Sequence, residues 1–209
     1  MGDSFTRTVL WLTAILGAIT LLLYLFVFDT WVIPSDDPLL TASILPTLSP
    51  EDRILTRRGA QPVFGQLARC TIPDGTGKFT IGRVFGSGGD EVTIDNERVT
   101  VSGRTTKSRF ACGVVNVVHP VSGDAMPLSC STEDNGSFTY SVLAHPQFRE
   151  PARTAKVEPN KLFLVSDDRH IHKDSRDFGA VDASTCEHVV FRLWGETFGD
   201  STHRFNVLW

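Results

Sequence analysis

The first stretch of the chain with a clear pattern runs from Thr8 to Phe28, where apolar residues dominate and no residue is charged. About twenty such residues cross the hydrocarbon core of a bilayer as a helix. A cleaved secretory signal has a shorter apolar core followed by small residues, whereas Trp31, an aromatic near the expected interface, follows here. We predict an uncleaved transmembrane helix over residues 9–28, preceded by a short N-terminus at residues 1–8.

After residue 28 the pattern changes to short runs of Val, Ile, Thr and Phe between clusters of Gly, Pro, Asn and Asp. Such runs are typical of strands, and no later stretch keeps a helical period. We expect residues 29–209 to form a mostly β domain that is antiparallel and partly barrel-like. The expected strands are Arg53 to Thr56, Gln66 to Ile72, Phe79 to Phe85, Glu91 to Ile94, Arg98 to Val101, Gly113 to Val118, Phe138 to Leu143, Leu162 to Val165 and His188 to Leu193.

Two stretches give the domain further detail. Asp95-Asn96-Glu97 separates two strand-like runs and indicates a hairpin turn. Over residues 103–159 the pattern weakens into Ser, Thr, Gly and Pro. We expect this region to be an insertion or cap on the core, with few strands.

Composition narrows the class of protein. The net charge of -4 comes without a basic block, so a nucleic-acid partner is not expected. The four cysteines lack the close pairing of a zinc site, and we expect neither a metal nor a cofactor. In an oxidising compartment they would form disulfides, and a Cys112–Cys130 bridge over about nineteen residues would add roughly 3 kcal/mol. Pairing of Cys70 with Cys186 is open at this point.

The charges beside the apolar segment indicate its orientation. Arg7 precedes it, whereas Asp29, Asp36 and Asp37 follow it. The positive-inside rule places the short N-terminus in the cytoplasm and the β domain on the exported side of the inner membrane. The chain is therefore expected to be a single-pass membrane protein.

A serine, Ser43, lies among small and apolar neighbours shortly after the apolar segment. Pro46 has a fixed φ and no backbone donor, so it prevents a regular helix or central strand at that point. We expect Ser43 to stand on a rigid, non-helical turn, where it would be held at a constant height above the membrane. The alternative is an ordinary loop next to the membrane.

Three blocks, in this order along the chain, resemble the bacterial signal peptidase I family. Ser43 to Leu48, followed by Asp52 to Leu55, is similar to Ser-Met-x-Pro-Thr-Leu with a downstream Gly-Asp. Arg83 to Val92 is similar to Lys-Arg-Val-x-Gly-x-Pro-Gly-Asp-x-Val. Asp167 to Gly179 is similar to Asp-Asn-Arg-Asp-Asn-Ser-x-Asp-Ser-Arg-x-Phe-Gly, without a gap. Each block alone is weak evidence, but together they indicate homology from Ser43 to about Trp194.

This resemblance implies a membrane serine endopeptidase that removes signal peptides from exported preproteins. Ser43 would attack the peptide carbonyl, and Thr41 takes the place of a hydroxyl residue of the oxyanion region. Such a serine needs a base for its proton and donors for the developing oxyanion. The implied partners are preprotein signal peptides and membrane lipid.

One departure from the family pattern concerns the base. The family lysine immediately precedes Arg-Val of the second block, and that position is Gly82 here. Glycine accepts no proton, and the Arg83 guanidinium stays protonated. Lys78 is four residues away, about 13 Å along a strand, which is too far without a bulge.

A second departure suggests a replacement. His172 takes the place of the serine that, in the family, lies beside the lysine amine. Histidine titrates near neutral pH and is the commonest general base. We hypothesise a dyad of Ser43 and His172, with Asp174 or Asp168 orienting the ring. The alternative is a surface histidine in a polar loop.

The remaining polar residues of the third block have a simpler expected role. Asp174 and Arg176 match a structural acid and arginine near the site, and we expect an ion pair that fixes the loop. Asp168 and Arg169 belong to the same loop. Two other functions compete with the peptidase. One is a catalytically inactive relative that binds signal-like segments or scaffolds a partner, and the other is a generic anchored β domain.

Overall fold

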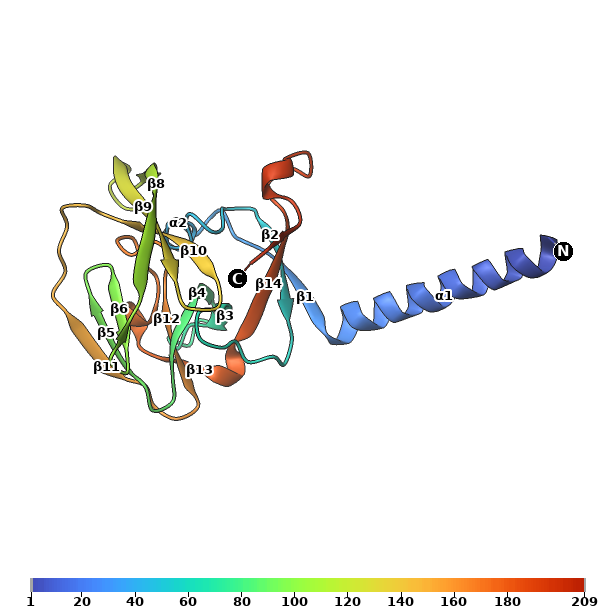
Figure 1. Cartoon of the computed structure of the whole chain (residues 1–209), viewed down its shortest axis with the longest axis horizontal. Coiled ribbons are helices and arrows are strands. Elements are labelled where there is room, and N and C mark those ends of the chain that lie inside the picture. Colours follow the sequence, from blue (N-terminus) through green and yellow to red (C-terminus); the bar gives the residue numbers. More distant parts are fainter. Residues whose placement is uncertain (1, 209) are drawn as a thin grey trace.

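The computed structural model describes residues 2–208, beginning with a long helix, α1 (Gly2–Phe26). Its segment Ser4–Phe26 is long and apolar enough to cross a membrane, and its side chains are exposed. The helix projects away from the β domain (Figure 1). It ends two residues before the predicted limit, because β1 (Phe28–Val32) starts at once. Arg58 fixes this junction by donating to the carbonyls of Leu25 and Val27.

The main sheet is antiparallel, in the order β1-β2-β14-β3-β4-β12-β13, with β15 beside β14. It curls into a half-barrel, which confirms the predicted mostly β, partly barrel-like fold (Figure 1). Its remaining strands are β2 (Arg53–Arg57), β3 (Leu67–Thr71), β4 (Phe79–Ser87), β12 (Lys161–Val165), β13 (Val181–Asp182), β14 (Glu187–Trp194) and β15 (Asn206–Val207).

Two smaller sheets cover one side of this half-barrel, with strand orders β10-β9-β8 and β11-β5-β6-β7. Most of their strands lie within residues 103–159, so the expectation of few strands there is wrong. The strand β8 is almost wholly exposed, and its side chains therefore lack the apolar alternation that marks a half-buried strand. The bounds are β5 (Glu91–Asp95), β6 (Arg98–Val101), β7 (Arg104–Thr105), β8 (Lys107–Val118), β9 (Ala125–Asp134), β10 (Thr139–Ala144) and β11 (Arg153–Lys156).

All nine predicted runs fall on strands, with end points that differ by a few residues at most, apart from the longer β8. The predicted hairpin turn joins β5 to β6, and Asn96 within it has a φ of 55°, a conformation that asparagine tolerates well. Both disulfides form. Cys112–Cys130 links β8 to β9 as predicted, and Cys70–Cys186 ties β3 to the start of β14.

A short helix, α2 (Pro38–Ser43), precedes the main sheet's second strand. Asp37 caps it by accepting the Leu40 N–H at 3.0 Å, and Pro38 occupies its first turn. Ser43 is thus the last residue of a helix, and the expected non-helical turn is wrong at this residue. Pro46 acts only after the helix has ended. Leu40 packs with apolar residues of the main sheet, and Ala42 packs against the β8–β9 hairpin.

Candidate active site

Ser43 is fully buried at the end of α2. Its hydroxyl donates to the Leu40 carbonyl at 2.8 Å, one turn back in the same helix. Its own carbonyl accepts the backbone N–H of Asp168 at 3.1 Å. The loop after β12 therefore lies directly against Ser43, and the first and third sequence blocks meet here.

Thr41 is half-buried, and its hydroxyl donates to the Pro38 carbonyl at 3.1 Å. Residues two apart on a helix point to different faces. Thr41 and Ser43 therefore direct their hydroxyls apart in this conformation.

Asp167 joins all three sequence blocks through one buried carboxylate. Arg83 of β4 donates to it from Nε at 2.7 Å and Nη2 at 3.1 Å, and both side chains are 1–2% exposed. The Thr47 hydroxyl, four residues after Ser43, donates to the same carboxylate. The guanidinium of Arg83 also lies 4.0 Å from the ring centroid of Tyr140. This network holds the Ser43 segment, β4 and the loop after β12 in one arrangement.

A second buried network starts from Arg169. Its guanidinium donates to Glu133 of β9 at 2.8 Å and lies 5.0 Å from the ring centroid of Phe85. The Tyr140 hydroxyl of β10 donates to the same carboxylate at 2.8 Å. Burial and the charge of Glu133 raise the pKa of Tyr140. The residues expected to form a cap are thereby bound to the loop that carries Asp168.

Asp174 and Arg176 form the predicted ion pair, with Nη2 and Oδ2 2.7 Å apart and both side chains buried. Asp174 also caps α3 (Ser175–Phe178) and accepts the Ser166 N–H at 2.7 Å. Burial opposes ionisation of Asp174, but the charge and hydrogen bonds of Arg176 hold its pKa below the usual range. The contacts of the Asp174 carboxylate therefore stabilise the loop and the start of α3.

Asp168 is a different kind of carboxyl. It is fully buried, and Oδ1 accepts the N–H groups of His170 and Ile171 at 2.9 and 2.8 Å. Oδ2 is buried and has no hydrogen-bond partner in residues 2–208. Burial raises the pKa of Asp168 to about 7, against these hydrogen bonds and the positive charges of Arg176 and His172.

His172 directs both ring nitrogens to carboxylates. Nδ1 lies 2.9 Å from Asp177 Oδ2, and Nε2 lies 3.5 Å from Glu150 Oε1. Although burial lowers it, the hydrogen bond to Asp177 gives His172 a raised pKa. Within residues 2–208, His172 and Ser43 form no hydrogen bond with each other, so the hypothesised dyad is not assembled in this conformation.

His172, Asp174 and Asp177 each offer a ligand atom, and these atoms lie within 4.8 Å of one another. A cation placed among them would meet the Arg176 guanidinium, which already neutralises Asp174. The cluster also supplies both bonds of the capping box of α3. Its chemistry therefore suits loop structure better than metal binding.

Gly82 lies in the middle of β4, between β3 and β12. A Cβ at this position would lie 3.1 Å from Leu164 Cβ and 3.3 Å from the Val165 carbonyl oxygen. Thr80 shares its strand parity and donates to the Lys173 carbonyl, so this face of β4 is turned toward the third block. The first carbon of any side chain at the position of the missing lysine would therefore be crowded by β12.

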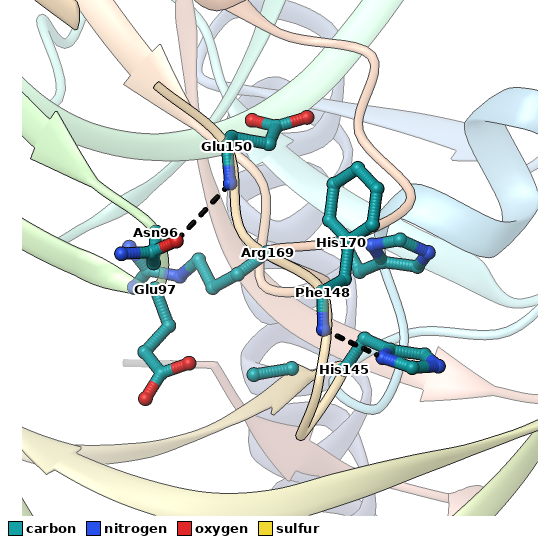
Figure 2. Close-up of a pocket in the computed structure, with 8 residues that line it drawn as sticks. Asn96, Glu97, His145, Phe148, Glu150, Arg169 and His170 are labelled. Carbon is teal, nitrogen blue, oxygen red and sulfur yellow. Dashed lines mark hydrogen bonds between the residues drawn. The ribbon is translucent and has the colours of Figure 1, made fainter. Parts of the chain in front are cut away.

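A small pocket lies beside the same loop, between the β5–β6 turn and the segment after β10 (Figure 2). The rings of His145 and His170 face each other there, with centroids 5.0 Å apart, and Phe148 packs on His170. His145 Nδ1 accepts the N–H groups of Gln147 and Phe148, so in the neutral ring Nε2 carries the hydrogen. That nitrogen is then a donor, which does not suit a metal ligand.

A groove runs beside the N-terminal half of α2, between the segment before this helix and the start of β4. Leu40 and Phe79 line it, together with the ion-paired Lys173 and Asp37. Leu40 also holds the Ser43 hydroxyl through its carbonyl. Ser43 does not line the groove, but it is one hydrogen bond away from Leu40, which does.

Three features of the site were not anticipated from the sequence. They are the shared carboxylate of Asp167, the Arg169–Glu133 pair and the unpartnered oxygen of Asp168. Arg83 and Asp167 are both inside the quoted blocks, and an arginine and an aspartate at fixed places offered a signal for pairing. Glu133 lies in the region of weak pattern and gave no signal.

The sequence profile of the family described as Signal peptidase, peptidase S26 matches the chain over residues 6–194. A comparison with curated proteins gives no match.

Proposed function

Since this chain belongs to the signal peptidase family S26, we propose that it is a membrane-anchored serine endopeptidase that removes signal peptides from exported preproteins. Ser43 is the nucleophile of this proposal. Its hydroxyl oxygen attacks the scissile carbonyl to form an acyl-enzyme, which water then hydrolyses. Membrane lipid and the signal peptides of preproteins are the partners.

The observation that carries the proposal is the meeting of the three sequence blocks around Ser43. Asp167 binds Arg83 and Thr47 through one carboxylate, while Asp168 donates to the carbonyl of Ser43. Long-range contacts of this kind hold a serine at a fixed place relative to two other segments. This is the preorganisation that nucleophilic catalysis requires.

The groove beside α2 is the proposed binding place for the substrate. An extended peptide lying between the segment before α2 and the start of β4 would pass Leu40, whose carbonyl holds the Ser43 hydroxyl. The ion-paired Lys173 and Asp37 line the same groove and would contact such a peptide. Small residues before the cleaved bond would fit most easily.

The proposed location is the inner membrane, with one span and the β domain on the exported side. The apolar helix Ser4–Phe26 and the two disulfides support it, because disulfides persist in oxidising compartments. Labelling of the native chain in intact cells with a membrane-impermeant amine reagent tests the side. Modification of lysines in the β domain agrees with the proposal, and protection of all of them contradicts it.

The function is tested with the full chain in detergent or proteoliposomes and a preprotein with an Ala-x-Ala site. Wild type is expected to cleave it, and Ser43→Ala to lose at least about a thousandfold in kcat/KM. Ser49→Ala, on the same segment, serves as the control and should keep its rate. Equal rates for wild type and Ser43→Ala would remove Ser43 as nucleophile.

A second function, a catalytically inactive relative that binds signal-like segments, is favoured by two observations. Gly82 occupies the place of the family's lysine, and Ser43 is completely buried. This function predicts binding of a signal peptide to wild type and Ser43→Ala alike, with no product from either over a wide pH range.

A further inference from the structure

We propose that Asp168 is the proton acceptor for Ser43, directly or through one water molecule. This inference rests on the proposed function and names the group that replaces the missing lysine. It concerns a carboxyl that the sequence suggested only as an orienting or structural residue.

Asp168 lies next to Ser43. The Asp168 N–H donates to the Ser43 carbonyl at 3.1 Å, which brings the two residues side by side. Both side chains are fully buried. A base must be within hydrogen-bond reach of the proton it takes, or one water away. The backbone contact holds Asp168 next to Ser43.

Asp168 Oδ2 is free to accept a proton. Asp168 Oδ1 is occupied by two backbone N–H groups, whereas the buried Oδ2 has no partner in residues 2–208. A buried polar atom without a partner is costly, and such atoms in native proteins often have a catalytic role. Asp167 and Asp174, the other buried carboxylates of this loop, are saturated by Arg83 and Arg176.

Asp168 also has a pKa that suits a base, and the rival groups are already paired. Burial raises the pKa of Asp168 to about 7, close to the value that serves a general base at neutral pH. Of its rivals, His172 directs both ring nitrogens to carboxylates, and the Lys173 amine is paired with Asp37 at the opposite end of α2. Both rivals are therefore already paired with carboxylates.

In the proposed reaction, Asp168 takes the proton of Ser43 and passes it to the leaving amine. A substrate passing Leu40 displaces the Ser43 hydroxyl from that carbonyl, and Oγ bonds to the scissile carbonyl carbon as its proton moves to Asp168 Oδ2. When the C–N bond breaks, the leaving amine takes this proton. Water then attacks the carbonyl carbon of the ester and gives a proton to Asp168. The C–Oγ bond breaks, and Ser43 Oγ takes this proton from Asp168.

The test uses the full chain and three variants. Asp168→Asn, the residue found at this place in the quoted motif, keeps an oxygen for the N–H groups of His170 and Ile171 but accepts no proton. His172→Gln tests the rival base. Glu150→Gln removes a carboxylate beside the same loop that does not touch Ser43, and serves as the control.

Two rates are measured across about pH 5 to 9, namely cleavage of the preprotein and acetylation of Ser43 by p-nitrophenyl acetate, located by mass spectrometry. In wild type both should rise with an apparent pKa near 7. Asp168→Asn should lower both by about 10²–10⁴-fold. Glu150→Gln should change neither by more than a few-fold.

A carbon-13 titration of the aspartate carboxyls checks the inference independently of activity, with a midpoint near 7 that is missing from Asp168→Asn. Cleavage by Asp168→Asn at the wild-type rate would overturn the inference and leave the peptidase intact, as would loss of cleavage only in His172→Gln. If acetylation of Ser43 depends on Asp168 but no preprotein is cleaved, the proposed peptidase function is wrong, and the role of Asp168 as proton acceptor stands.

Discussion

Arg83 and Asp167 form a buried, two-pronged ion pair, with Nε–Oδ1 and Nη2–Oδ2 distances of 2.7 and 3.1 Å. The two residues are 84 positions apart in the chain, and Thr47 adds a third segment through the same carboxylate. Burying both charges is unfavourable, so a pair of this kind is strongly stabilising only relative to states in which one partner is missing. It fixes the geometry around Ser43.

The first prediction follows from this pair. Arg83→Met should lower the free energy of unfolding by about 3–5 kcal/mol, because it leaves the Asp167 carboxylate buried and unpaired. Lys161→Met removes an exposed partner of Glu158 and should cost less than about 1 kcal/mol. Denaturant unfolding in detergent checks both. A cost for Arg83→Met no larger than that of the control would show that the pair does not hold the site together.

The second prediction concerns Gly82. Gly82→Ala should cost about 1–3 kcal/mol, because its Cβ would press on Leu164 and on the Val165 carbonyl. Gly82→Lys should cost at least as much and should not raise the rate of cleavage, since its Cβ is crowded by β12 in the same way. Gly199→Ala meets open space and should be nearly neutral. A stable, more active Gly82→Lys protein would contradict this prediction.

The third prediction is a pH dependence of stability. Because the pKa of Asp168 is raised from 3.8 to about 7, the folded protein holds a proton that the unfolded chain releases between these values. Stability should therefore fall as pH rises from about 4 to 7, by up to about 4 kcal/mol relative to Asp168→Asn. Unfolding of both proteins across this range measures the difference, and parallel curves would show that Asp168 titrates normally.

The fourth prediction separates the two disulfides. The Cys112–Cys130 bridge closes a loop within one hairpin, whereas Cys70–Cys186 joins residues 116 apart. In the chain-entropy model, removing them should cost about 3 and about 5 kcal/mol respectively. Unfolding of the two double serine variants compares these values. The reverse order of stability would show that strain or residual structure in the unfolded chain outweighs loop length.

Local pattern predicted nine runs that all form strands, but it missed other strands, among them the long β9, and it did not predict the packing around the site. Leu162 to Val165 and Arg98 to Val101 are short apolar or alternating runs bounded by turn residues, and each forms a strand. The strand β8 was only partly seen, because it is exposed and held by its ladder with β9 rather than by an apolar face.

The sequence likewise predicted only part of the site. The motif blocks predicted the Asp174–Arg176 ion pair, which the structure confirms, because matching motifs carry tertiary information that composition lacks. The helix that ends at Ser43 depends on the Asp37 cap and on packing of Leu40, which no short pattern around Pro46 indicates. The contacts of His172 with Asp177 and Glu150 are tertiary as well, and the sequence alone could not distinguish them from a contact with Ser43.

The junction at residues 26–28 has a mechanical consequence. Only Val27 separates α1 from β1, and Arg58 donates to the carbonyls of Leu25 and Val27 at this connection, so helix and sheet are joined without a long linker. With α1 in a bilayer, a tilt or vertical shift of this helix would therefore move the β domain that carries Ser43. Bilayer thickness would thereby set the depth at which this protein gauges a substrate, and lipid composition would become a determinant of which bond is presented to it.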